Sequence, residues 1–243
     1  MRLSPMVSAF FLFAVFLAAA EVPASDRAPV VVELFTSEGC SSCPPADRLL
    51  AEIEKQMGAN VIVLSEHVDY WDYIGWKDPF ATTELTARQQ RYSRNIGGNE
   101  GVYTPQMVID GRTGFVGSDG KRAQAEIKKA SAHKKTQVTI EKRGEQLAIS
   151  TNAVPANANV LIAITEANLE TDVRRGENSG RKLRHTGVVR ALTNLGKAER
   201  GKTFTAEFSP KLDAAWKRGD LRAVVLVEDR SSHEILGAAV LPL

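Results

Sequence analysis

The feature that most constrains this chain of 243 residues is the pair formed by its only two cysteines, Cys40 and Cys43. The pair follows an apolar run at 28–35 (APVVVELF), which is typical of a strand buried on both faces. Pro44 and Pro45 come next, and prolines suit the first turn of a helix because the amide groups they lack have no partner there. The sequence therefore predicts that both cysteines lie at a turn from a strand into a helix.

Residues 1–24 have the composition of a secretory signal peptide. Arg2 precedes an apolar run at 6–20, and small residues suited to cleavage end the segment at Ala24. The run is short for a transmembrane helix, so an uncleaved anchor is the less favoured alternative. We therefore expect a periplasmic or secreted protein with no membrane association after signal cleavage.

The composition of the chain gives little reason to expect a nucleic-acid partner. Apolar residues make up 43% of the chain, charged residues 25%, and the net charge is +2. Nucleic-acid binding needs a concentrated basic face, which this balance does not suggest.

The spacing of the cysteines favours redox chemistry over a structural role. In an oxidising compartment a cysteine pair usually forms a disulfide, but a bridge over so short a loop removes little entropy from the unfolded chain. Closely spaced thiols suit exchange, because the second thiol can resolve a mixed disulfide formed at the first. A helix N-terminus stabilises a thiolate, so we assign Cys40 as the nucleophile and Cys43 as the resolving thiol, with a structural bridge as the alternative.

The order of elements expected over 28–133 is strand, helix, strand, helix, hairpin and helix. Beyond the first strand and helix, these are a strand at 61–65, a helix opened by Asp78 and running to Ile96, a hairpin at 106–117 and a helix capped by Asp119. This order, with the cysteines at the first turn, resembles a thioredoxin fold. The resemblance implies a cis-proline beside the cysteines at Thr104-Pro105, with the backbone of Thr104 offered to an extended substrate chain.

Four motifs carry a narrower resemblance that spans nearly the whole mature chain. They are SEGCSSCPPAD, HVDYWDYIGWKDPF, GVYTPQMVIDG and RRGENSGRKLRHTGVVR. Together they resemble the exported family known as domain of unknown function 1223. The resemblance supports the expected fold and export, and it supplies no substrate.

Two further residues are candidates for chemistry beside the cysteines. The thioredoxin resemblance implies a buried acid on the first strand that takes the proton of the resolving thiol, and Glu33 is the nearest match, although it lies one residue further from Cys40 than the pattern has it. A solvent-facing or lysine-paired Glu33 is the alternative. His67 follows the second strand, at the sheet edge that the cysteine turn shares, where it would stabilise the thiolate, ligate a metal or, as we favour, hydrogen-bond a loop.

The segment at 70–76 (YWDYIGW) concentrates aromatic residues near the same edge. Tyr70, Trp71 and Trp76 are candidates for an apolar groove that binds a protein substrate. A seam between two domains is an equally good explanation of such a cluster.

Past residue 135, regularly spaced strands predict an antiparallel, β-sandwich-like domain over 136–243. One loop in this half is rich in arginine, and its Arg175 and Arg181 are candidates for substrate binding. We expect a solvated tip, as is usual for charged loops. The alternative is a loop folded over the cysteines, where its cations would lower the Cys40 pKa and hold an acidic partner.

The leading functional prediction is an exported thiol–disulfide oxidoreductase that exchanges electrons with protein thiols or disulfides. Its redox-active disulfide would need no added cofactor, and a redox partner would restore it because the chain has no further cysteine. One alternative is a copper-binding or copper-delivery protein that uses Cys40, Cys43 and His67, since thiolates favour Cu(I). The other is a binding module with an inert disulfide.

Overall fold

The computed structural model describes residues 28–96 and 101–243, and the predicted signal peptide at 1–24 lies outside them. None of the helices in these two ranges combines the length and the apolar character needed to cross a bilayer.

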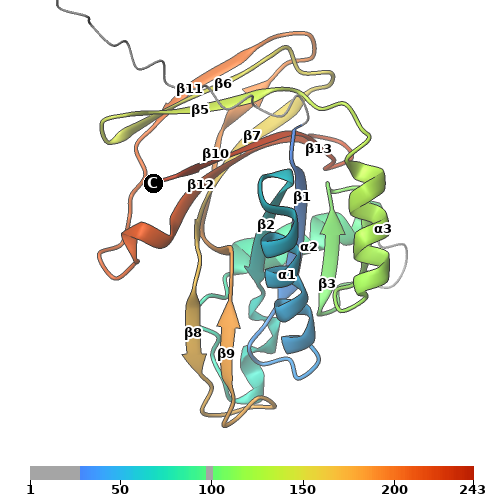
Figure 1. Ribbon diagram of the computed structural model, residues 1–243, viewed down its shortest axis with the longest axis vertical. Coiled ribbons are helices and arrows are strands. Elements are labelled where there is room, and N and C mark those ends of the chain that lie inside the picture. Colours follow the sequence, from blue (N-terminus) through green and yellow to red (C-terminus); the bar gives the residue numbers. More distant parts are fainter. Residues whose placement is uncertain (1–27, 97–100) are drawn as a thin grey trace, which may run out of the picture.

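A mixed sheet of eight strands, in the order β13-β12-β7-β10-β2-β1-β3-β4, forms the centre of the molecule (Figure 1). Its strands are β1 (Val30–Thr36), β2 (Val61–His67), β3 (Gln106–Ile109), β4 (Thr113–Val116), β7 (Ala158–Glu166), β10 (Val188–Ala198), β12 (Leu221–Asp229) and β13 (Ile235–Pro242). β1 and β2 are parallel, whereas β3 is antiparallel to β1 and β4 to β3. The sheet therefore passes from the first half of the chain into the second without a break.

Helices cover both faces of the first half of this sheet (Figure 1). These helices are α1 (Pro44–Met57), α2 (Thr83–Ile96) and α3 (Gly120–Ala130). Val32 of β1 packs with Leu50 of α1 and Ile127 of α3, while Val31 packs with Leu85 of α2 on the opposite face. Because β1 is buried on both faces, its sequence is a continuous apolar run instead of an alternating one.

A second, antiparallel sheet in the order β11-β6-β5 packs against the other end of the main sheet. Its strands are β5 (Val138–Arg143), β6 (Gln146–Thr151) and β11 (Phe204–Phe208). Leu147 and Ile149 of this sheet share a core with Val160 and Val225 of the main sheet. Antiparallel strands in the second half are thus confirmed.

Most strands of the second half thus lie in two packed sheets, as the sandwich-like prediction expects, but one of these sheets is not separate from the first half. β10 enters the sheet beside β2, where Val188 pairs with Ser65, so β7, β10, β12 and β13 extend the sheet of the first half. The expected division of the chain into 28–133 and 136–243 stays a prediction.

A two-stranded hairpin, β8 (Leu169–Asp172) and β9 (Lys182–His185), lies beside α1 (Figure 1). Neither strand is among those expected from the sequence. Thr186, just past β9, donates a hydrogen bond to Glu54 of α1. The hairpin therefore carries the charged loop of the second half along the flank of the first. Short 3-10 helices complete the fold at η1 (Gly58–Asn60), η2 (Asp69–Ile74) and η3 (Arg218–Asp220).

Candidate functional site

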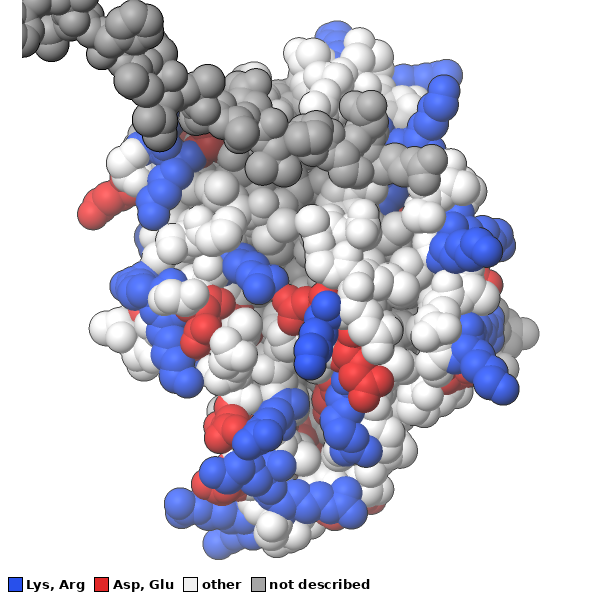
Figure 2. All heavy atoms as spheres, in the orientation of Figure 1, with Lys and Arg blue, Asp and Glu red and all other residues white. Residues whose placement is uncertain are grey.

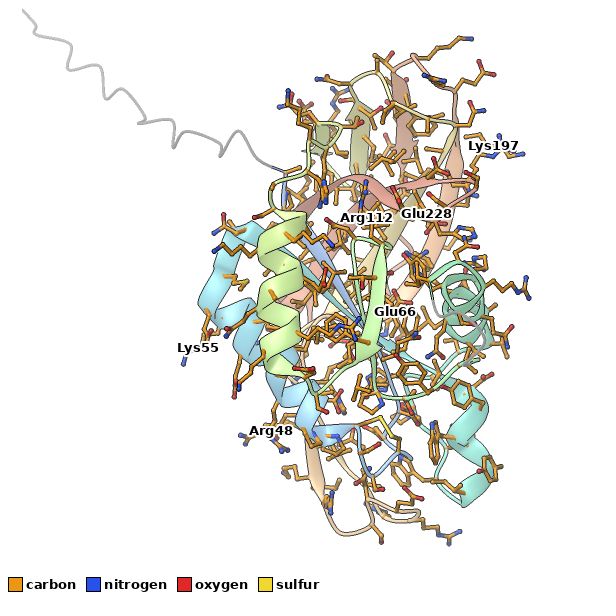
Figure 3. The ribbon with its side chains drawn as sticks, turned by 90° about the vertical axis from the view of Figure 1, so that its right-hand side faces the viewer. Arg48, Lys55, Glu66, Arg112, Lys197 and Glu228 are labelled. Atoms are coloured by element: carbon orange, nitrogen blue, oxygen red, sulfur yellow. A yellow bond between two sulfur atoms is a disulfide. The ribbon has the colours of Figure 1, made fainter. Side chains whose placement is uncertain are left out.

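Cys40 and Cys43 form a disulfide in the turn between β1 and α1 (Figure 3, yellow bond), with their Cα atoms 5.4 Å apart. Cys43 is the N-cap residue of α1, and the prolines occupy its first positions as the sequence predicts. Cys40 precedes this N-cap residue, and its Sγ lies 3.3 Å from the hydroxyl of Ser42. Both cysteines are 0% exposed. The disulfide therefore lies at the predicted turn, and surrounding elements bury it completely.

The Thr104–Pro105 peptide bond is cis, as the thioredoxin resemblance implies, and it lies against Cys40. The carbonyl oxygen of Thr104 is 3.8 Å from Cys40 Sγ. Trp71 Nε1 donates a hydrogen bond of 2.7 Å to the Thr104 hydroxyl, which ties the aromatic segment to the same loop. The structure thus brings together four of the predicted site residues from three separate segments.

Residues 173–181, which connect β8 and β9 and which we call the cap, fold over the cysteine turn. Asn178 is fully buried, and its Nδ2 donates to the carbonyl oxygens of Glu38 (2.8 Å) and Cys40 (2.9 Å). Glu177 Oε2 accepts the backbone N–H of Ser41 at 3.0 Å. The expectation of a solvated tip is therefore wrong for this stretch, because its amide and carboxylate side chains find backbone partners in the turn.

The cap also changes the environment expected for the Cys40 sulfur. Free amides at a helix N-terminus would favour a thiolate at this sulfur, but the N–H of Ser41 is bonded to Glu177. The N–H of Cys43 donates to the Cys40 carbonyl at 3.2 Å, and the N–H of Cys40 donates to Ser37 at 3.1 Å. With the cap in place, a carboxylate occupies the amide beside Cys40 that would otherwise favour a thiolate.

The aromatic segment packs between the cysteine turn and the cap. A β-carbon on Gly39 would lie 3.1 Å from Trp71 Cβ, and one on Gly176 would lie 3.2 Å from Trp76 Cβ. Trp76 Nε1 donates to Glu38 Oε2 at 2.8 Å, which fastens the segment to the turn. In this arrangement the two tryptophans form a seam between the first half of the chain and the cap.

The tyrosines of this segment differ in their surroundings. Tyr73 is 83% exposed, whereas the hydroxyl of Tyr70 donates to Gln89 Oε1 at 3.1 Å. Burial raises the pKa of Tyr70 to about 12, so its hydroxyl stays protonated at neutral pH. Tyr70 therefore serves as a hydrogen-bond donor to α2.

Two buried histidines lie beneath the turn, with ring centroids 4.8 Å apart. His67 Nδ1 is 2.7 Å from Asp78 Oδ2, and His185 Nε2 is 3.2 Å from Glu38 Oε1. Burial alone would lower the pKa of His67, but the neighbouring Asp78 carboxylate outweighs it and the pKa lies above its ordinary value. His67 thus bonds a loop residue, which is the role we favoured for it.

The copper alternative finds no matching geometry in the part of the chain that the structure describes. No group of three or more His, Cys, Asp or Glu side chains there could hold a metal ion. His67, the expected third ligand, has its Nδ1 engaged by Asp78.

Asp47 is a buried carboxyl that the sequence analysis missed. It lies in the first turn of α1, and its N–H donates to the carbonyl of Cys43 at 3.1 Å. Residues four apart on a helix share a face, so this spacing was the available signal. Burial raises the pKa of Asp47, although His185 and His67 oppose the rise. The carboxyl therefore holds its proton to a higher pH than an ordinary aspartate.

Glu33, the acid expected to serve the resolving thiol, belongs to a different cluster. Arg88 Nε donates to its Oε1 at 2.8 Å and the Tyr92 hydroxyl to its Oε2 at 2.7 Å, so both oxygens are engaged. Arg88 also contacts Glu228 of β12 at 2.5 Å and Glu66 of β2 at 3.3 Å, and these two glutamates are labelled in Figure 3. This buried ion cluster joins the two halves of the chain and engages both carboxylate oxygens of Glu33.

Lysine and arginine side chains gather at the end of the molecule that carries β8 and β9 (Figure 2). The cations of the cap and of β9 are Arg174, Arg175, Arg181, Lys182 and Arg184. Arg175 is exposed, and Arg181 Nη1 donates to Asn178 Oδ1 at 3.0 Å. Both predicted binding arginines therefore belong to the loop that covers the cysteines.

The fold and the site define a class of protein in which a mixed sheet with helices carries a disulfide-bonded Cys-x-x-Cys turn closed by a hairpin loop. The family model described as "Protein of unknown function (DUF1223)" matches residues 31–228, and the chain belongs to this family. The family resemblance of the four motifs is confirmed.

Two solved structures share the fold. A crystal structure of a protein from Agrobacterium tumefaciens is 32% identical, covers 90% of this chain and 96% of its own, and superposes with a TM-score of 0.75. HBP35 of Porphyromonas gingivalis is 16% identical over 90% of this chain and 76% of its own, with a TM-score of 0.64. At 16% identity, the likeness to HBP35 shows the fold alone. A search of curated proteins finds no match.

Proposed function

We propose that this protein is an exported thiol–disulfide oxidoreductase that acts through Cys40 and Cys43 in a thioredoxin-like unit. The strand order β2-β1-β3-β4, with α1 and α3 on one face and α2 on the other, supports the thioredoxin-like assignment. The composition of residues 1–24 supports export. The observation that carries the proposal is the disulfide at the start of α1, with the Thr104 carbonyl 3.8 Å from Cys40 Sγ.

The exchange follows from these positions. A substrate thiolate attacks Cys40 Sγ, a bond forms between the two sulfurs, and the Cys40–Cys43 bond breaks. Cys43 leaves with the electron pair and takes a proton from Asp47, whose raised pKa suits it as a donor. A second substrate thiolate then attacks the mixed disulfide at the substrate sulfur and releases Cys40 as a thiolate. The substrate dithiol is oxidised to a disulfide, the enzyme disulfide is reduced, and the reverse steps reduce a substrate.

A substrate reaches Cys40 only when the cap moves away. The cysteines are 0% exposed, and the bonds from Asn178 and to Glu177 hold the cap in place. Lifting the cap opens a path to the sulfur and frees the Ser41 amide. The freed amide then stabilises the Cys40 thiolate that forms on reduction.

The burial of both cysteines also favours a second candidate function, a binding module with an inert disulfide. One experiment separates the two candidates. The mature protein is incubated with dithiothreitol at neutral pH, and free thiols are counted by alkylation and mass spectrometry over time. The reduced protein is then mixed with a disulfide-bonded peptide.

Rapid reduction of the folded protein, followed by transfer of electrons to the peptide, supports an oxidoreductase. Cys40→Ser should abolish transfer, whereas Cys43→Ser should trap a mixed disulfide with the peptide, because the resolving thiol is gone. A disulfide that resists dithiothreitol until the protein is unfolded in denaturant would leave only the inert module.

A further inference from the structure

We propose that the protein substrates carry a carboxylate next to their reactive cysteine, and that this carboxylate takes the place of Glu177 on the Ser41 amide. The arginines of the cap would then form the docking surface for an acidic polypeptide segment. This inference rests on the proposed function and adds a substrate class to it.

The first observation is the bond between Glu177 and the turn. Glu177 is an exposed side chain of the cap, and its carboxylate accepts the N–H of Ser41, the residue next to Cys40, at 3.0 Å. Hydrogen bonding by Ser41, from its side chain first and from its backbone N–H second, holds the pKa of Glu177 below its ordinary value. The amide therefore accepts a carboxylate supplied by the protein itself. Lifting the cap removes Glu177 and leaves the same amide open to an acid on the incoming chain.

The second observation is the unbalanced charge of the cap. Arg174 and Arg175 are exposed, and neither side chain pairs with a carboxylate within the described residues. The cations of β9 differ, because Lys182 and Arg184 both pair with Glu170 of β8. The net charge of the whole chain is only +2, so the excess of positive charge beside the cysteines is local.

Ser41 and Ser42 complete the approach to the disulfide. They are the exposed residues of the Cys-x-x-Cys turn, and the cap lies directly against them through Glu177. In the proposed complex, the polypeptide that reaches Cys40 lies between this edge and the arginines of the cap. Acidic residues beside its cysteine would meet cations on one side and a backbone N–H on the other, which favours an acidic chain over a basic one.

The test uses three synthetic peptides in which a single cysteine is flanked by aspartate, asparagine or lysine on both sides. Each peptide reduces the disulfide-bonded protein, and its rate is divided by its rate with hydroxyethyl disulfide, a neutral small disulfide, to remove differences in thiol reactivity. The aspartate peptide should react about fivefold faster than the asparagine peptide, as one or two exposed ion pairs allow. The lysine peptide should be slowest, and the differences should shrink in high salt.

Charge reversal on the cap identifies the surface. Arg174→Glu combined with Arg175→Glu should invert the order of the peptides. The matched control, Lys121→Glu with Lys128→Glu on exposed positions of α3, should leave the order unchanged. Glu177→Gln should raise the reduction rate with all three peptides and keep their order, because it weakens the bond of the cap to the Ser41 amide, for which the substrate carboxylate competes.

Equal normalised rates for the aspartate and asparagine peptides, or an inversion in the α3 control as well, would overturn the inference. Dithiothreitol carries no charge and separates this outcome from failure of the proposed function. A protein that dithiothreitol reduces while the peptides show no order loses only the acidic substrate. A protein that dithiothreitol cannot reduce in its folded state loses both.

Discussion

Replacing Asn178 with alanine should release the cap. The side chain donates two buried hydrogen bonds, at 2.8 and 2.9 Å, to the carbonyl oxygens of Glu38 and Cys40. Each such bond contributes about 1 to 1.5 kcal/mol, and in the closed state the variant leaves both carbonyls buried without these donors. Asn178→Ala should therefore shift the cap equilibrium toward the open state by about 2–3 kcal/mol, or about 30- to 150-fold.

The rate of disulfide reduction reports this shift. If reduction by dithiothreitol proceeds through a rarely populated open state, its rate rises in proportion to the open population, so Asn178→Ala should react up to about 100-fold faster. The measurement is the appearance of free thiols after rapid mixing, with denaturant unfolding of the oxidised protein run in parallel. The unfolding data separate a released cap from a protein that is unfolded as a whole.

A matched control lies in the same loop. Ser179 is exposed, and its hydroxyl donates to the Arg174 carbonyl within the cap, at 3.0 Å. Ser179→Ala should change the reduction rate less than about twofold, because surface substitutions of this kind usually stay within about 0.5 kcal/mol. If Asn178→Ala loses stability as expected and reduces no faster than Ser179→Ala, the cap does not control access to the disulfide.

Three further predictions concern the buried charges and the joint between the halves. Because burial raises the pKa of Asp47, the folded state binds more protons than the unfolded state above pH 3.8, and the free energy of unfolding falls as the pH rises from there through the folded pKa. Asp47→Asn should flatten that part of a pH profile of stability measured by denaturant unfolding. An unchanged slope would contradict the raised pKa. Arg88→Met should cost about 3–5 kcal/mol in the free energy of unfolding, since it leaves buried carboxylates without their cation, whereas Arg48→Met on the exposed side of α1 should cost less than about 0.5 kcal/mol. A fragment of residues 28–135 should lack dispersed amide resonances in NMR, because it loses the β10 neighbour of β2 and the Glu228 partner of Arg88; a well-dispersed spectrum would show that the first half folds alone.

The strand-to-helix turn could be predicted because its signals are local. A β-branched run buried on both faces, followed by prolines at the first positions of α1, specifies the turn within about twenty residues of sequence. The hairpin of β3 and β4 and the Asp119 cap of α3 follow from equally local patterns. These features do not depend on how the second half of the chain packs.

The start of α2 shows where local signals fail. Asp78 followed by proline predicts a helix N-terminus at that point, but the helix begins at Thr83, after the Thr82 hydroxyl that accepts the N–H of Leu85. The Asp78 carboxylate instead bonds His67 and the N–H of Glu38. A good capping residue is also a good buried acceptor, and only the tertiary structure decides between the two uses.

The position of the cap and the pairing of β10 with β2 could not be predicted from the sequence, and the reason is the same for both. Asn178 bonds carbonyl groups that lie 138 and 140 residues away, and β10 pairs with β2 through one register position, Val188 with Ser65. Neither contact has a sequence period, and a charged glycine-containing loop is usually solvated. The expectation for the loop was wrong because the hydrogen bonds of Asn178 and Glu177 hold it against the cysteine turn, although its composition is typical of a solvated loop.

The closed cap and the reduced cysteine pair oppose each other electrostatically. Glu177 accepts the amide of Ser41, so its carboxylate lies next to the position where reduction places a thiolate on Cys40. Two like charges at neighbouring positions destabilise each other, and the thiolate also loses the amide that Glu177 occupies. Reduction of the disulfide should therefore favour the open cap, and by linkage opening of the cap should favour reduction by the same factor. In the proposed oxidoreductase, the second half of the chain would therefore take part in the redox site through this one loop.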